Sequence, residues 1–191
     1  QKAHRIIVPR QATKNDFIRI YKCNSEKIVV VPHGGPDITG KNNPLFNKWT
    51  ETETQEILKI ARIKEKDLII LYIGRLEFKK NLVKLVEGFS RFLKEYPDWK
   101  LVLAGKRGIG FGDIWNKVVE LGLQDSVILP GYITEREKVF LLEKCRVFAF
   151  PSKYEGFGLP ILEAFAYRRP VLTSKVSSMP EIAGQAAFLV N

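Results

Sequence analysis

The sequence predicts an α/β fold built on a doubly wound parallel sheet. Short β-branched and apolar runs recur along the 191-residue chain, helix-period stretches separate them, and several runs are apolar on both faces. Strands buried on both faces are typical of parallel sheets whose right-handed crossover helices cover both sides. Such sheets bind ligands in the loops beyond the carboxyl ends of their strands. The residues that follow each predicted strand are therefore the candidates for function.

The N-terminal stretch predicts a βαβ piece of its own. A strand is expected over residues 4–9, a helix over 13–21 and a second strand over 27–31. Residues 32–44 are rich in Gly, Pro and Asn, a composition typical of a linker. A polar helix is expected next, over residues 51–62.

These elements divide the chain into three expected parts. Residues 1–34 would end a first domain, residues 35–66 would form a linker and connecting helix, and residues 67–191 would form most of a second domain. The chain begins at Gln1, and its one methionine is Met179, so we expect a processed or interior piece of a longer protein.

The main part alternates predicted strands with predicted helices. Its strands are expected over residues 67–73, 100–104, 127–129, 147–150 and 171–173. Residues 81–96 place their apolar side chains on one helical stripe, and Thr134 with Glu137 forms a capping box ahead of a further helix. Another helix is expected to begin near Pro160 and to end before Pro170.

Composition excludes several classes of protein. No apolar run approaches the roughly 20 residues that span a bilayer, and no signal peptide opens the sequence. Cys23 and Cys145 form no CxxC and are interpreted as reduced thiols of a cytoplasmic protein, while His4 and His33 lack partners at metal-ligand spacing. The formal charge of +10 indicates either a polyanionic partner or a solvated lysine-rich surface, because the basic residues are scattered.

The loop after the first strand of the main part carries two cations. Gly74 permits a tight turn and the close approach of a ligand. Arg75 can offer a planar fork to phosphate oxygens, and Lys80 adds a charge at a helix start, where N–H groups also attract anions. A diphosphate is the natural partner of this set, with ordinary surface charges as the alternative.

The next two strand ends are less specific. Gly105 opens a basic loop over residues 105–112 that matches neither GxGxxG nor GxxxxGK[ST], and a long surface turn is the alternative. Tyr132, followed by Ile133, can cover a base or ribose, although an aromatic residue after a strand usually serves packing.

The end of the fourth strand of the main part is the most informative. Gly156 and Gly158 flank Phe157 immediately before a predicted helix, which exposes backbone N–H groups at a positive helix end. Glu155 and Glu163 bracket this turn, one in the loop and one a turn inside the helix. A core helix does not require this arrangement, so it predicts an anion cradle beside a polar anchor for sugar hydroxyls.

In this order, the strand-end residues resemble those of the retaining glycosyltransferases of family four. The matching elements are Gly74-Arg75 with Lys80, Ala104-Gly105, Pro130-Gly131-Tyr132, Pro151-Ser152, and Glu155 with Glu163, which seven residues separate. The resemblance covers the chain from about residue 3 to its end and implies the GT-B fold of two facing Rossmann-like domains. Residues 1–34 would end its acceptor domain, and residues 67–191 would be its donor-binding domain without the terminal helices.

The resemblance also implies a role for each position. Arg75 and Lys80 would hold the donor diphosphate and stabilise its charge, Glu155 would contact the donor sugar, and Glu163 would contact the ribose. Further donor contacts would come from Gly74, Gly105, Tyr132, Ile133, Gly156, Phe157, Gly158 and Leu159.

The implied reaction transfers a hexose from a nucleotide diphosphate sugar to a glycan or lipid-linked acceptor, with retention at the anomeric carbon. No cofactor or essential metal is expected, since cationic side chains and a helix dipole stabilise the leaving group and no Asp-x-Asp occurs. Residues 173–181 resemble mannosyltransferases of surface polysaccharide synthesis, which favours GDP-mannose. The basic surface suits peripheral contact with the inner face of an anionic membrane, or lysine enrichment of the thermophile kind.

Two other functions stay open. Because nearly all of the acceptor domain is missing, the chain alone is expected to bind donor and transfer nothing, and a non-catalytic sugar-nucleotide-binding subunit is an alternative. A nucleic-acid-binding α/β module would show a contiguous basic stripe. No helix-turn-helix, RNP-like strand or zinc pattern supports it, so a nucleic acid partner is not expected.

Overall fold

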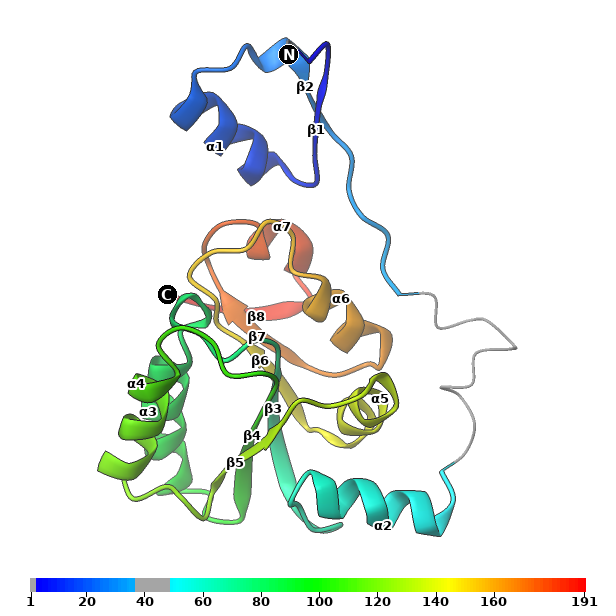
Figure 1. Ribbon diagram of the computed structural model, residues 1–191, viewed down its shortest axis with the longest axis vertical. Helices are drawn as coiled ribbons and strands as arrows, with labels where there is room; N and C mark the ends of the chain where they lie inside the picture. The colour runs from blue at the N-terminus through cyan, green and yellow to red at the C-terminus, as the bar shows by residue number, and fades with distance from the viewer. Residues whose placement is uncertain (1–2, 37–48) are drawn as a thin grey trace.

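A six-stranded parallel sheet forms the centre of the protein. The computed structural model describes residues 3–36 and 49–191 (Figure 1). The strands of the sheet lie in the order β5-β4-β3-β6-β7-β8, and every neighbouring pair is parallel. They are β3 (Leu68–Ile73), β4 (Trp99–Ala104), β5 (Val127–Gly131), β6 (Val147–Phe150), β7 (Val171–Ser174) and β8 (Ala187–Val190). The doubly wound parallel sheet predicted from the sequence is confirmed.

The strand order reverses between β3 and β6. From β3 the chain runs outward through β4 to β5, then returns to place β6 on the other side of β3 and continues outward through β7 to β8. Ile70 pairs with Val147 and Leu71 with Phe148 across this central junction. In doubly wound sheets such a reversal opens a crevice at the carboxyl ends of the two strands. The loops that follow β3 and β6 therefore flank the expected binding position.

A smaller unit precedes the sheet. β1 (Ile6–Val8) pairs in parallel with β2 (Ile28–Val30), and α1 (Gln11–Tyr21) connects them ahead of a short 3-10 turn (Ser25–Lys27). The type and order of these elements agree with the prediction, and both strands are shorter than expected. Residues 37–44 of the predicted linker lie outside the described residues.

Helices cover the sheet and enclose its core (Figure 1). They are α2 (Glu51–Ile60), α3 (Leu82–Leu93), α4 (Phe111–Glu120), α5 (Glu135–Lys144), α6 (Leu159–Ala166) and α7 (Met179–Ala183), and a 3-10 turn (Phe78–Lys80) leads into α3. α3 and α4 lie side by side (Figure 1). Within residues 3–36 and 49–191, no helix has both the length and the apolar character needed to cross a membrane.

The hydrophobic core lies between the sheet and these helices. Leu71, Leu101 and Phe148 of the central strands are almost completely buried. The polar helix α2 also belongs to this core, since its Ile57 and Leu58 are buried in the same cluster. The residues that connect the two units therefore help to stabilise the larger one.

Three elements were not predicted. The expected basic loop over residues 105–112 was too long, because Gly110 adopts φ 83° as the N-cap of α4 and the helix begins at Phe111. α7 has only five residues, too few for a helical period to be recognised. β8 is an edge strand of four residues with alternating burial, a pattern too short to predict a strand from the sequence.

The predicted capping box at the start of α5 forms as expected and can be tested. The Thr134 hydroxyl accepts from the Glu137 amide over 3.3 Å, and the Glu137 carboxylate accepts from the Thr134 amide. Thr134→Ala leaves first-turn N–H groups without a partner and is expected to lower the free energy of unfolding by about 1 kcal/mol in urea titration. Thr52→Ala, at an exposed helical position of α2, is the control and should not be destabilising. Equal urea midpoints for Thr134→Ala and the wild type would contradict the assignment.

Candidate functional site

The loops after three neighbouring strands are joined at the carboxyl edge of the sheet. The amide of Gly74, after β3, donates to the carbonyl of Ala104 at the end of β4 over 3.0 Å. The amide of Gly105 donates in turn to the carbonyl of Gly131 at the end of β5 over 2.7 Å. These bonds continue the sheet pairing beyond the strands, so they hold the predicted base-framing and phosphate-binding loops side by side.

Two of the predicted glycines stand where a side chain would not fit. A Cβ on Gly105 would lie 1.9 Å from the carbonyl oxygen of Gly74, and one on Gly74 would lie 2.7 Å from the hydroxyl of Tyr72. Their φ angles of 145° and 150° are also unfavourable for other residues. Both glycines are therefore required for the close approach of the β3 and β4 loops, whatever else they contact.

Lys80 and Glu155 meet across the junction of β3 and β6. Lys80 ends the 3-10 turn that follows the β3 loop, and its ammonium forms an ion pair with Glu155 Oε1 from the β6 loop. The two side chains are only 11% and 14% exposed. The Lys80 ammonium also lies 5.3 Å from the centre of the Phe150 ring. The structure thus brings together a cation and a carboxylate that the sequence assigned to one site from separate loops.

Serine hydroxyls hold the backbone around Glu155. Ser177 Oγ donates to the Glu155 carbonyl over 2.7 Å and lies 3.3 Å from the Glu155 amide. Ser178 Oγ lies 2.9 Å from the carbonyl oxygens of both Glu155 and Phe157. The loop after β7 therefore fixes the loop after β6, an interaction that the sequence reading did not identify.

The start of α6 presents backbone amides without a side-chain cap. Gly158 is the N-cap with φ 101° and has no side chain of its own to cap the helix, and Pro160 occupies the first turn. Leu159 is half exposed at this helix end, whereas the Phe157 ring is buried. First-turn N–H groups and the helix dipole favour an anion at such a position.

Glu163 lies one helical turn further along α6 and is paired with a lysine. Its Oε1 lies 2.8 Å from the ammonium of Lys138, which comes from α5. The same ammonium contacts Glu135 at 2.7 Å. The carboxylate expected to contact ribose is therefore already held by a cation in this structure.

The backbone carbonyl of Arg75 accepts a hydrogen bond from a buried tyrosine. The Tyr72 hydroxyl donates to the carbonyl of Arg75 over 3.0 Å, and its ring stacks on Phe150 at 6.0 Å between centroids. Burial raises the pKa of Tyr72, and the charges of Glu155 and Glu77 raise it further, so the hydroxyl stays protonated and remains a donor. Tyr72 thus orients the turn that carries Arg75.

Two residues expected near the base, Tyr132 and Ile133, differ in their exposure to solvent. The Tyr132 ring is exposed, and the Lys106 ammonium lies 4.9 Å from its centre. Ile133 is half buried against the core. The geometry places Tyr132 beside the Gly105 loop, while its contact with a base stays a prediction.

Helix α1 of the smaller unit contacts this site through its first turn. The amides of Gln11 and Ala12 donate to the two oxygens of Glu181 in α7, over 3.0 and 2.7 Å. Arg10, the N-cap of α1, makes no side-chain cap, so Glu181 takes over that role from another part of the chain.

A second set of contacts joins α1 to the β6 loop. Thr13 Oγ1 donates to the Gly156 carbonyl over 3.2 Å, and the Tyr154 hydroxyl donates to Asp16 over 2.9 Å. The hydrogen bonds from Arg19 and Tyr154 lower the pKa of Asp16, so the carboxylate is charged at neutral pH. The loop between Tyr154 and Gly156, which holds Glu155, is therefore in direct contact with α1.

Most of these supporting residues were missed because each resembles ordinary structure in the sequence. Tyr72 lies within a strand, Ser177 and Ser178 lie in a polar loop, and Lys138 is one of many lysines. Their roles depend on which strand ends become neighbours, which the linear spacing does not encode. Glu181 could have been recognised from the sequence, since it directly follows Pro180 in the first turn of a helix that comes after another strand.

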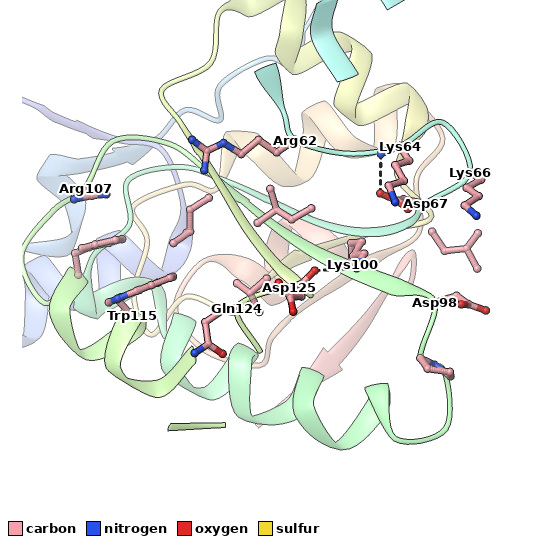
Figure 2. Close-up of a pocket in the computed structure, with 16 residues that line it drawn as sticks. Arg62, Lys64, Lys66, Asp67, Asp98, Lys100, Arg107, Trp115, Gln124 and Asp125 are labelled. Atoms are coloured by element: carbon pink, nitrogen blue, oxygen red, sulfur yellow. Dashed lines mark hydrogen bonds between the residues drawn. The ribbon is translucent and has the colours of Figure 1, made fainter. Parts of the chain in front are cut away.

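A separate groove of about 1050 Å³ lies away from these residues (Figure 2). It runs along the edge strand β5 and reaches Trp115 of α4, and Lys66 and Asp98 lie toward its other end. None of its 16 lining residues is a predicted site residue. This groove is therefore not the candidate site.

The fold and the strand-edge site together define a Rossmann-like domain of the GT-B glycosyltransferases. Its features are the parallel sheet that reverses between β3 and β6, the paired Lys80 and Glu155, and the uncapped start of α6. The chain belongs to the family of glycosyl transferases group 1, whose sequence profile matches residues 53–191.

Individual relatives agree with this assignment. The chain is 38% identical over 126 residues to O-antigen chain mannosyltransferase B of Escherichia coli, covering 63% of this chain and 32% of that protein. It is similar to the C-terminal domain of a glycosyl transferase group 1 protein from Francisella tularensis, with 30% identity, a TM-score of 0.62 and 72% and 73% of the two chains covered. Anabaena HepE in complex with UDP and glucose has the same fold, with 22% identity and a TM-score of 0.79 over 99% of this chain and 50% of that one.

The chain is short beside two of these proteins. It spans 32% of the Escherichia coli mannosyltransferase and 50% of the HepE chain.

Proposed function

We propose that this chain is the donor-binding part of a longer retaining glycosyltransferase, which transfers mannose from GDP-mannose to a glycan or lipid-linked acceptor. The observation that carries the proposal is the meeting of Lys80, Glu155 and the uncapped start of α6 at the reversal point of the sheet. A diphosphate leaving group is stabilised by cations and N–H donors that lie close together. Here both come from adjacent loops. Relatives named as mannosyltransferases support the choice of sugar.

The proposed division of roles follows the loops. Arg75 and Lys80 bind the diphosphate and stabilise its charge as the glycosidic bond breaks, without an essential metal. The amides of Gly158 and Leu159 bind the same anion, and Glu155 accepts hydrogen bonds from the sugar hydroxyls. In the structure Lys80 and Glu155 form an ion pair. Donor binding therefore replaces this ion pair with a contact between Lys80 and the diphosphate and a contact between Glu155 and the sugar.

The nucleoside end is assigned to the neighbouring loops. Glu163 binds the ribose hydroxyls, and Gly105, Tyr132 and Ile133 frame the base. The chain alone binds donor and transfers nothing, since acceptor contacts belong to the rest of the enzyme. Peripheral contact with an anionic membrane is proposed from the formal charge of +10.

Nucleotide binding by this chain tests the proposal. Calorimetric titration is expected to show that GDP binds more tightly than UDP or ADP, with or without Mg²⁺. Arg75→Ala and Glu163→Ala should each weaken GDP binding by about tenfold or more, because each removes a charge-assisted hydrogen bond. Arg146→Ala, an exposed arginine at the amino end of β6, is the control and should bind as the wild type does. A wild-type chain that binds none of the three nucleotides would contradict the proposal.

A further inference from the structure

Lys138 of α5 occupies an unusual position beside the candidate site. Its ammonium bridges two carboxylates, Glu135 on its own helix at 2.7 Å and Glu163 on α6 at 2.8 Å. Its side chain is 17% exposed, and Glu163 is 25% exposed, whereas Glu135 is 75% exposed. The contact with Glu163 is therefore the less solvent-exposed of the two, and it joins α5 to α6.

The ammonium remains charged in this environment. Burial disfavours the charged form of Lys138, but the hydrogen bonds to Glu135 and Glu163 outweigh it and raise the pKa of the lysine. Because the charge and the position are both maintained, the Glu163 carboxylate is held by a fixed cation.

The two oxygens of Glu163 differ in the contacts they make among the described residues. Within the part of the chain that the structure describes, the hydrogen bond and ion pair of this carboxylate both go to Oε1. A carboxylate has acceptor capacity on both oxygens. Oε2 is therefore available to accept hydrogen bonds from a ligand while Oε1 stays anchored.

We propose that Lys138 is a positioning residue of the donor site, which fixes Glu163 so that its second oxygen accepts hydrogen bonds from the vicinal hydroxyls of a ribose. This inference rests on the proposed function, in which Glu163 contacts the nucleoside. A carboxylate held in its binding orientation loses less side-chain freedom when the ligand arrives. The ligand class is a ribonucleoside diphosphate, and Lys138 increases the preference for ribose over a sugar that lacks the two hydroxyls.

The test compares GDP with 2′,3′-dideoxy-GDP by calorimetry. The wild type is expected to prefer GDP. Lys138→Met should reduce the ratio of the two affinities by about fivefold or more, through weaker binding of GDP with little change for the dideoxy nucleotide. Lys138→Arg should restore most of the ratio, because the guanidinium can still reach Glu163. In a Glu163→Ala background, Lys138→Met should change the ratio no further.

The control is Lys117→Met, which removes a lysine of similar exposure from α4. Lys117 pairs with Glu120 at 2.7 Å and with Glu87 at 3.9 Å, away from the α5–α6 contact. It should leave the affinity ratio unchanged, and urea unfolding should show that every variant is folded.

Different outcomes overturn different claims. If Lys138→Met weakens GDP and dideoxy-GDP equally, or leaves both unchanged, the positioning role is wrong while the nucleotide site stands. If the wild type binds neither nucleotide, the proposed function fails and this inference fails with it. If the wild type binds both equally, the assignment of Glu163 to ribose is wrong, and the role of Lys138 is wrong with it.

Discussion

Substituting Lys80 with methionine is expected to slow sugar transfer by about 10²- to 10³-fold when introduced into the complete transferase. Methionine keeps the length and the apolar stem of the side chain but removes the charge that stabilises the departing diphosphate. The loss should appear mainly in kcat, since the charge on the leaving group develops fully only as the bond breaks. Initial rates of transfer from GDP-mannose measure it.

The same substitution should destabilise the chain, and this effect can be separated from the first. Glu155 would stay largely buried without its cation, which is expected to lower the free energy of unfolding by about 3 kcal/mol. Adding Glu155→Gln removes the uncompensated charge and should recover much of the stability without recovering transfer. Lys84→Met, an exposed lysine on α3, is the control and should affect neither property. A Lys80→Met enzyme that transfers within about threefold of the wild type would refute the assignment.

Gly105→Ala is expected to lower the free energy of unfolding by about 3 kcal/mol or more. The added Cβ would lie 1.9 Å from the carbonyl oxygen of Gly74 and 2.7 Å from its carbon. Both atoms belong to backbone that pairs β3 with β4, so the clash cannot be relieved by turning a side chain. Urea unfolding at equilibrium measures the change.

Gly112→Ala is the matched control for this substitution. Gly112 lies in the first turn of α4, and a Cβ there would meet nothing within 4 Å. Alanine should therefore raise the free energy of unfolding by about 0.5–1 kcal/mol, because the unfolded chain loses freedom and the helix is favoured. If Gly105→Ala unfolds within about 1 kcal/mol of the wild type, the close approach of the two loops is not as described.

The fold was largely predictable because its local patterns agree with its tertiary structure. The apolar runs became β3, β4, β5, β6 and β7, and the capping box and the proline at the start of α6 formed where expected. The rest required information that local patterns do not carry. α4 begins directly after Gly110, whose backbone is in the left-handed region, within a stretch that the sequence predicted as a loop. β8 is a short strand that is stabilised by its pairing with β7.

The sequence suggests the residues of the candidate site but not the contacts between them. Lys80, Glu155 and Glu163 were chosen from their positions after strands and at a helix start. That Lys80 pairs with Glu155, and Glu163 with Lys138, depends on which loops and helices the strand order makes neighbours. Side chains 75 and 25 residues apart are brought together in these two pairs. Spacing along the chain gives no measure of such proximity.

The hydrogen bonds between α1 and the β6 loop have a thermodynamic consequence. Glu181 holds the first turn of α1, and Tyr154 binds Asp16, so the loop that carries Glu155 is ordered partly by the smaller unit. Coupling free energies are reciprocal: the free energy by which a ligand at the loop favours the docking of α1 equals the free energy by which docked α1 favours that ligand. A ligand bound at the loop and a ligand that displaces α1 must therefore oppose each other in affinity. Helix α1 and the loop that carries Glu155 are therefore coupled even when no single ligand contacts both.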